Sequence, residues 1–201
     1  MRDLYPEDEK KYKWLPTLLD AYEIADEVNS ELLKDKAKNG VAIACSKGCN
    51  ACCKRPSVPF TAPELMGISW FASEKLSGPI RSVVKQQLRA HESTTRCPFL
   101  VEEGCSIYPV RPLACRQFFM AGMPCRDGEE IMESRPQDIV IPSKDGGRQV
   151  AMKLLEHFGI TKPSEKLKAF NSGFIVVNSK QMHEYDWNLI ADTMDIFDQE
   201  T

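Results

Sequence analysis

Eight cysteines confined to one stretch of the chain constrain its folding more than any other feature of the sequence. They are Cys45, Cys49, Cys52, Cys53, Cys97, Cys105, Cys115 and Cys125. The first 44 residues and the last 76 residues contain no cysteine. Cysteines that only filled space in a hydrophobic core would be scattered along the chain. The segregation therefore indicates a segment that folds around its thiols.

The state of these thiols depends on the compartment in which the protein works. The first residues are charged and lack the apolar segment of a secretory signal, and no run of 18 apolar residues predicts a membrane span. We therefore expect a cytoplasmic protein with no membrane contact. Cytoplasmic thiols stay reduced, and clustered cysteines there more often bind metal or catalyse reactions than form disulfides. A disulfide framework and reduced core cysteines are the less favoured alternatives.

The spacing of the first cysteines is typical of metal ligands. Thiolate is a soft ligand that binds zinc, copper(I) or iron–sulfur clusters. Cys49-x-x-Cys52 has the spacing of one arm of a zinc site, and three residues separate Cys45 from Cys49. One arm supplies too few ligands, so the fold must bring in others. We predict that all eight cysteines are metal ligands, the others being Cys53, Cys97, Cys105, Cys115 and Cys125.

How the cysteines are shared between metal atoms stays open at this point. A disulfide between the adjacent Cys52 and Cys53 would be strained, and their side chains diverge, so they can serve different ligand sets. A hairpin with the loop 102–104 would leave Cys97 about 13 Å along the strand from the residue that faces Cys105. Either Pro98 bends this strand back, or Cys97 and Cys105 belong to different sites.

Charge is distributed unevenly along the chain. Residues 45–125 carry ten basic and five acidic residues, which gives +5, whereas the remainder carries −8. Nearby cations would offset the charge of four thiolates around a zinc ion and lower the pKa of the thiols. A basic face unrelated to any metal is the alternative. The overall charge of −3 argues against a nucleic-acid-binding protein.

The motifs themselves resemble a known family. "CSKGCNACC", "CPFL", "GCSIYPVRPLACRQF" and the final Cys125 are similar to the CxxCxxCC family of YkgJ-type cysteine-cluster proteins. One spacing departs from the family pattern, since three residues follow Cys45 where the family has two. The resemblance implies a cofactor that is zinc or iron, including a 4Fe–4S cluster. The cysteine cluster of a flagellin lysine methylase is also similar.

The hydrophobic pattern predicts a mainly α fold with a small β-hairpin, organised as a single irregular, metal-stabilised α(+β) domain with a long N-terminal helix. That helix is predicted over residues 7–37, with Asn39-Gly40 as its end. Thr61-Ala62-Pro63-Glu64 has the pattern of a capping box. The other predicted elements are helices to about residue 75, at 77–91, 148–158 and 185–197, and strands at 139–141 and 173–177.

Three regions are predicted along the chain. Residues 1–40 form the N-terminal helix, residues 41–128 form the cysteine-cluster metal-binding core, and residues 129–201 form a C-terminal helical extension that packs on the core. We find no internal repeat and no low-complexity segment.

These observations favour a metal-binding protein that serves metal handling, redox chemistry or the support of a partner enzyme. Its expected partners are a metal ion and a protein. The alternatives are a lysine methylase-like, protein-modifying enzyme with an accessory iron–sulfur centre, and an interaction module with structural zinc. The sequence has no Gly-rich phosphate loop or dinucleotide fingerprint, and its three histidines are isolated. We therefore assign no catalytic residue and favour a non-enzymatic role.

Overall fold

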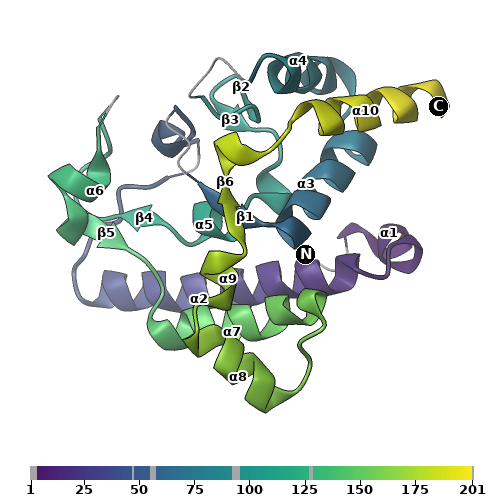
Figure 1. Cartoon of the computed structure of the whole chain (residues 1–201). Coiled ribbons are helices and arrows are strands. Elements are labelled where there is room, and N and C mark those ends of the chain that lie inside the picture. Colours follow the sequence, from purple (N-terminus) through teal and green to yellow (C-terminus); the bar gives the residue numbers. More distant parts are fainter. Residues whose placement is uncertain (1–3, 47, 55–57, 92–95, 127–128, 201) are drawn as a thin grey trace.

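Helix α2 (Leu15–Lys38) runs across the molecule between its other elements and supplies a large part of its core (Figure 1). The structure, a computed structural model, describes residues 4–46, 48–54, 58–91, 96–126 and 129–200. The buried side chains of α2 recur at intervals of three and four residues, as in an amphipathic helix. They are Leu15, Leu18, Leu19, Ala21, Tyr22, Ala25, Val28 and Asn29.

The single helix predicted over residues 7–37 is two helices in the structure. A short helix, α1 (Pro6–Lys11), ends before α2 begins, and Pro16 lies in the first turn of α2. Proline suits a first turn but interrupts a helix interior, because it lacks an N–H and its ring crowds the preceding turn. The predicted end of the helix is confirmed, since Gly40 adopts a left-handed φ of 73° immediately after it.

One layer of helices packs along α2. Helix α7 (Lys144–Leu154) continues as the 3₁₀ helix η6 (Leu155–Phe158), and both contact α2. This confirms the predicted helix over 148–158, with an earlier start at which the Ser143 hydroxyl accepts a hydrogen bond from the Gly146 N–H. Helix α8 (Pro163–Asn171), which was not predicted, packs against α7.

The strand predicted over residues 173–177 is wrong. Residues Phe174–Val177 form a helical turn, α9, after Gly173 has reversed the chain with a left-handed φ of 73°. The β-branched side chains there favour a strand, but strand propensity depends on cross-strand neighbours. The strand of this region lies just beyond, at β6 (Ser179–Gln181).

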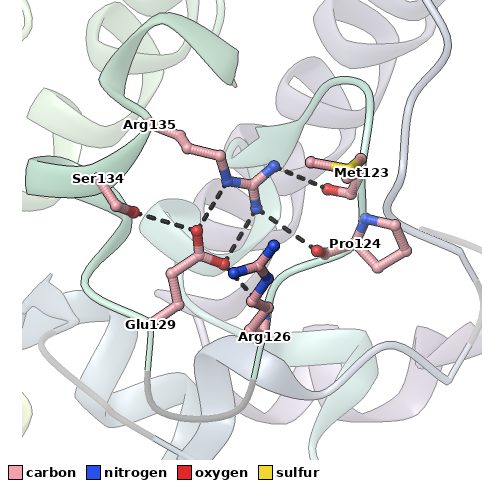
Figure 2. Close-up of a pocket in the computed structure, with 6 residues that line it drawn as sticks. All are labelled: Met123, Pro124, Arg126, Glu129, Ser134 and Arg135. Atoms are coloured by element: carbon pink, nitrogen blue, oxygen red, sulfur yellow. Dashed lines mark hydrogen bonds and ion pairs between the residues drawn. The ribbon is translucent and has the colours of Figure 1, made fainter.

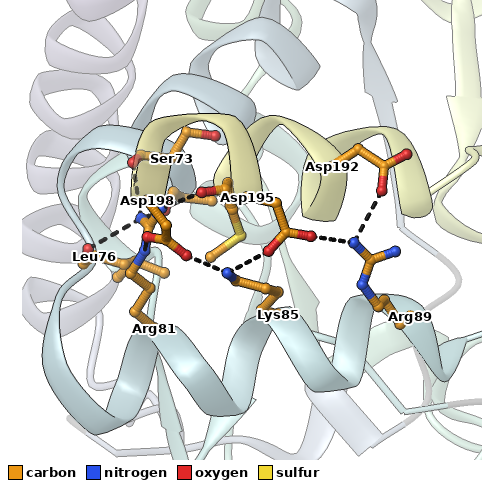
Figure 3. Close-up of polar contacts among 10 residues, drawn as sticks. Ser73, Leu76, Arg81, Lys85, Arg89, Asp192, Asp195 and Asp198 are labelled. Carbon is orange, nitrogen blue, oxygen red and sulfur yellow. Dashed lines mark hydrogen bonds and ion pairs between the residues drawn. The ribbon is translucent and has the colours of Figure 1, made fainter. Parts of the chain in front are cut away.

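A second group of helices is formed by α3 (Ala62–Glu74), α4 (Gly78–Arg89) and α10 (Asn188–Glu200). The predicted capping box is confirmed: the Glu64 carboxylate accepts hydrogen bonds from the N–H and the hydroxyl of Thr61. Helix α10 packs against both α3 and α4. Figure 3 shows the ion pairs between α4 and α10, which join Arg81, Lys85 and Arg89 to Asp192, Asp195 and Asp198.

The strands form small antiparallel pairs, so the fold is mainly α, as predicted. β1 (Pro59–Thr61) pairs with β6, β2 (Leu100–Val101) pairs with β3 (Gly104–Cys105), and β4 (Phe119–Met120) pairs with β5 (Ile139–Val140). The β5 strand confirms the prediction for 139–141. Short helical segments complete the described chain: η2 (Ala51–Lys54), η4 (Tyr108–Val110), α5 (Leu113–Arg116), α6 (Ile131–Ser134), η5 (Pro136–Asp138) and η7 (Met182–Glu184).

The predicted hairpin is confirmed, but its loop is shorter than predicted. Val101 pairs with Gly104 and Leu100 with Cys105, so the loop is Glu102-Glu103 alone. Both glutamates have positive φ, at 46° and 62°, whereas Gly104 belongs to the strand. Two central residues with positive φ match the right-handed twist of the strands in a two-residue turn.

Among the described residues, no helix combines the length and the apolar composition needed to cross a lipid bilayer.

Candidate metal centre

All eight cysteines are free thiols that come from separate segments of the fold. Cys45, Cys49, Cys52 and Cys53 lie on the loop that ends in η2, Cys97 and Cys105 flank the β2–β3 hairpin, Cys115 is on α5, and Cys125 follows β4. Cys97 is buried, and Cys49, Cys52 and Cys115 are exposed. The other four are half-buried.

The closest link across the segment joins Cys53 to Cys97. The backbone N–H of Cys97 donates a 2.8 Å hydrogen bond to the carbonyl oxygen of Cys53. The Cys97 side chain lowers the pKa of Cys53, because it stabilises the Cys53 thiolate. The same contact, with burial, raises the pKa of Cys97.

The hairpin brings Cys105 to the same place. The N–H of Leu100 donates a 3.1 Å hydrogen bond to the carbonyl oxygen of Cys97, so the chain turns at Pro98 before β2 begins. The bend at Pro98 that one of the two alternatives required is therefore present. Leu100 pairs with Cys105 in the hairpin. Burial raises the pKa of the Cys105 thiol to about 11.

Cys115 is held in place by a short helix whose start is fixed from a distance. The N–H of Leu113, the first residue of α5, donates a 2.7 Å hydrogen bond to Oε1 of Glu64 on α3. Glu64 is only 2% exposed, and burial raises its pKa. The Cys115 side chain is open to solvent on one side, yet desolvation by the surrounding protein raises the pKa of its thiol, and the neighbouring Cys53 and Cys105 add to this.

Two arginines supply positive charge beside these sulfurs. The buried Arg116 donates to both carboxylate oxygens of Asp26, at 2.8 and 2.7 Å, and to the Pro109 carbonyl oxygen. Its Nε is buried without a hydrogen-bond partner in the part of the chain that the structure describes. Arg111 stacks on the Tyr108 ring, 3.8 Å from its centroid. Both guanidinium groups favour the Cys105 thiolate.

The remaining sulfurs lie where the first loop meets the chain after β4. Ile43 and Ala121 form an antiparallel bridge, and the Met120 N–H donates a 3.3 Å hydrogen bond to Sγ of Cys45. Burial raises the pKa of the Cys45 thiol, and the neighbouring Cys49 and Cys125 add to this.

The sulfurs in this region have other cysteines among their electrostatic neighbours, and Cys125 also has Arg135 and Glu129 beside it. Cys125 interacts with Cys49, and Cys52 interacts with Cys53 as well as with Cys45, Cys49 and Cys125. The Cys52 side chain is open to solvent on one side, yet desolvation by the surrounding protein, with the neighbouring thiols, raises the pKa of its thiol to about 12.

An arginine clamp holds the backbone that leads to Cys125 (Figure 2). Arg135 donates hydrogen bonds to the carbonyl oxygens of Met123, at 3.1 Å, and Pro124, at 3.4 Å. It also forms two hydrogen bonds with the Glu129 carboxylate, and these lower the pKa of Glu129 to about 2. Sequence spacing gave no signal for this clamp or for the Glu64–Leu113 contact, because both join polar residues that occur everywhere in proteins.

The described residues contain no group of three or more His, Cys, Asp or Glu side chains that is already arranged to hold a metal ion. The thiols come instead from separate segments, and the segments that carry Cys53 and Cys97 are joined by a backbone hydrogen bond. Soft sulfur donors suit zinc and iron, and the unpaired Nε–H of Arg116 is a buried donor of the kind that stabilises a thiolate. The residue types therefore suit a zinc or iron centre. The cysteine side chains would have to come closer together to bind it.

The family comparison agrees with this chemistry. The model of the CxxCxxCC family, described as a "putative zinc- or iron-chelating domain", matches residues 44–138. No curated protein and no solved structure matches the chain. The matched segment contains all eight cysteines as well as Glu129 and Arg135. Residues 44–138, which include every cysteine of the chain, are therefore similar to the CxxCxxCC family.

Proposed function

We propose that this protein holds zinc or an iron centre through its eight cysteines, and that it serves metal handling, redox chemistry or the support of a partner enzyme in the cytoplasm. The observation that carries the proposal is the contact between Cys53 and Cys97, which come from different segments of the fold. The match of this segment to a zinc- or iron-chelating family supports the same conclusion. Eight free thiols are stable in a reducing compartment.

The protein's own residues would do three things for such a centre. The cysteines provide soft thiolate ligands, and a bound metal would supply a cross-link or a redox-active group. Arg111 and Arg116 would offset the negative charge of the thiolates beside Cys105. Arg135 would keep the chain before Cys125 in place.

The metal would also contribute to stability. A structural zinc site contributes roughly 10 to 16 kcal/mol, which is comparable with the whole stability of a domain at about 5 to 15 kcal/mol. The parts of the chain that carry the cysteines are loops, short helices and two-residue strands, whereas α2, α3 and α7 bury apolar faces of their own. We therefore expect metal to order the cysteine segment more than the helical layers.

Elemental analysis and a visible spectrum of protein purified without oxygen test the proposal. A brown sample that absorbs near about 400 nm, with stoichiometric iron, supports an iron–sulfur centre. A colourless sample with stoichiometric zinc supports zinc sites. Protein that contains neither metal, and that takes up neither when it is supplied, would overturn the proposal.

Single substitutions locate the ligands. Cys52→Ser and Cys115→Ser each replace an exposed thiol, and each should lower the metal content. His157→Ala is the control, because His157 lies on η6 beside α2 rather than in the cysteine segment. Equal metal loading in all three variants would contradict the assignment of the cysteines as ligands.

A further inference from the structure

Helix α5, which carries Cys115, is too short to be stable by itself. Its turn is closed by two 2.9 Å backbone hydrogen bonds, from the N–H of Arg116 to Pro112 and from the N–H of Gln117 to Leu113. The ends of a helix leave backbone groups without partners inside the helix, and isolated short helices are unstable in water. Contacts from other parts of the fold must therefore keep α5, and the thiol that it carries, in place.

Side chains of two long helices bind the two ends of α5. At its start, Glu64 of α3 accepts the 2.7 Å hydrogen bond from the Leu113 N–H. At its end, Nδ2 of Asn29 on α2 donates a 3.0 Å hydrogen bond to the carbonyl oxygen of Arg116. Glu64 and Asn29 are both buried. Loss of either contact would leave a buried polar group without a partner, which costs free energy, so both ends are firmly attached.

The Arg116 side chain attaches α5 to α2 a second time (Figure 1). Its buried guanidinium donates hydrogen bonds to both carboxylate oxygens of Asp26, at 2.8 and 2.7 Å, and its Cζ lies 4.6 Å from the centroid of the Tyr22 ring. Tyr22, Asp26 and Asn29 are spaced by four and three residues, so they share one face of α2. This face of α2 binds Arg116, the residue next to Cys115, through three side chains.

We propose that Asp26 and Asn29 are positioning residues for Cys115, and that helix α2 is therefore part of the metal-binding unit. This inference rests on the proposed metal-binding function. Asp26 fixes the side chain of Arg116 and Asn29 fixes its carbonyl group, so together they set where the neighbouring thiol lies. Both precede residue 44, where the match to the chelating family begins, so the family comparison gives them no role.

Metal affinity of the full-length chain tests the inference, measured for Zn²⁺ and for Fe²⁺ without oxygen against a competing chromophoric chelator. Asp26→Asn weakens the pair with Arg116 at a side chain that is 45% exposed, so the core stays closed. We expect about a tenfold loss of affinity, the lower end of the range for residues that orient a metal ligand. Asp20→Asn is the matched control, because Asp20 lies on the same helix but pairs with Lys153 of α7. It should leave the affinity unchanged.

A double-mutant cycle separates positioning of Cys115 from a general loss of stability. If Asp26 acts through Cys115, Asp26→Asn should have no further effect on metal affinity once Cys115→Ser is present. Combined with Cys125→Ser, on a different segment, it should keep its full effect. Circular dichroism and thermal unfolding check that each variant is folded.

Hydrogen exchange of the metal-free protein gives a readout that needs no metal. The backbone amides of α5 should exchange faster in Asp26→Asn than in the wild-type protein, because α5 opens more often. In Asp20→Asn they should exchange at the wild-type rate.

Three results would overturn the inference. One is an equal loss of affinity on Asp26→Asn with and without Cys115, and another is an equal effect of Asp20→Asn and Asp26→Asn. The third is metal binding that Cys115→Ser leaves unchanged, since such a thiol is no ligand. Wild-type protein that binds neither Zn²⁺ nor Fe²⁺ contradicts the proposed function instead. Unchanged hydrogen exchange of α5 in Asp26→Asn contradicts the attachment of α5 by Asp26, so the two failures are distinguishable.

Discussion

The carboxylate of Glu64 joins helix α3 to Leu113, the first residue of the helix that carries Cys115. One oxygen of Glu64 accepts a 2.7 Å hydrogen bond from the Leu113 N–H, and the other accepts the N–H and hydroxyl of Thr61. Glutamine offers one acceptor oxygen in place of two, so Glu64→Gln leaves a buried donor without a partner. We expect a loss of about 1–3 kcal/mol in the free energy of unfolding at pH 4, measured with urea.

The cost of this substitution should depend on pH. Burial raises the pKa of Glu64 above its unfolded value, so the folded state binds the proton more tightly. The stability linked to that proton is fully present below the unfolded pKa and is lost as the pH rises through the folded pKa. The difference between wild type and Glu64→Gln should therefore shrink towards pH 7. Glu133→Gln on the surface should leave the unfolding free energy unchanged, and a pH-independent difference for Glu64→Gln would contradict the assignment.

In the metal-free protein, Cys53 should be alkylated at lower pH than Cys52 or Cys105. Reaction requires the thiolate. The hydrogen bond from Cys97 lowers the pKa of Cys53, whereas burial raises the pKa of Cys52 to about 12 and that of Cys105 to about 11. Iodoacetamide labelling between pH 6 and 9, read by peptide mass spectrometry, measures the order. Cys97→Ala removes the hydrogen bond and should abolish the earlier labelling of Cys53. Labelling of Cys52 before Cys53 in the wild-type protein would refute the prediction.

Gly67→Ala should destabilise the protein. A Cβ at residue 67 would stand 2.4 Å from Cδ2 of Leu18, which is fully buried where α2 meets α3. Overpacking of this kind costs about 1–3 kcal/mol, more than the roughly 1 kcal/mol that alanine gains over glycine in a helix. Gly147→Ala is the matched control, because its Cβ would meet nothing within 4 Å on α7 and should stabilise the helix. Urea denaturation measures the free energy of unfolding of both variants. A change of the same sign in both would disprove the close packing at Gly67.

The ion pairs between α4 and α10 should make the attachment of the C-terminal helix depend on salt. Lys85 pairs with both Asp195 and Asp198, so Lys85→Met removes two contacts at once (Figure 3). We expect a lower melting temperature at low ionic strength and a smaller difference in 1 M salt, where the Debye length is only about 3 Å. Lys10→Met breaks a single exposed pair with Glu7 and serves as the control. Equal effects of the two substitutions at low salt would rule out a cooperative network.

Features that depend on near neighbours in the chain were predictable. The capping box of Thr61 and Glu64 and the glycine end of α2 were predicted, because each depends on residues a few positions apart. The prediction of a strand over 173–177 was wrong for a related reason. β-branched residues favour strands only when a neighbouring strand is present.

The amino-acid sequence by itself determined the chemistry of the candidate site, since the cysteines and their spacing specify soft sulfur donors, and it determined the amphipathic helices through their periodicity. Only the tertiary structure decided which sulfur meets which. Cys53 reaches Cys97, and Cys105 joins them, because Pro98 turns the chain and the hairpin packs on the core. The contacts of Glu64 with Leu113 and of Arg135 with the loop before Cys125 likewise depend on how the helices pack. The spacing of residues in the sequence limits the kind of ligand that they can bind. Whether residues far apart in the chain come close together is set by how the apolar faces of the intervening elements are buried.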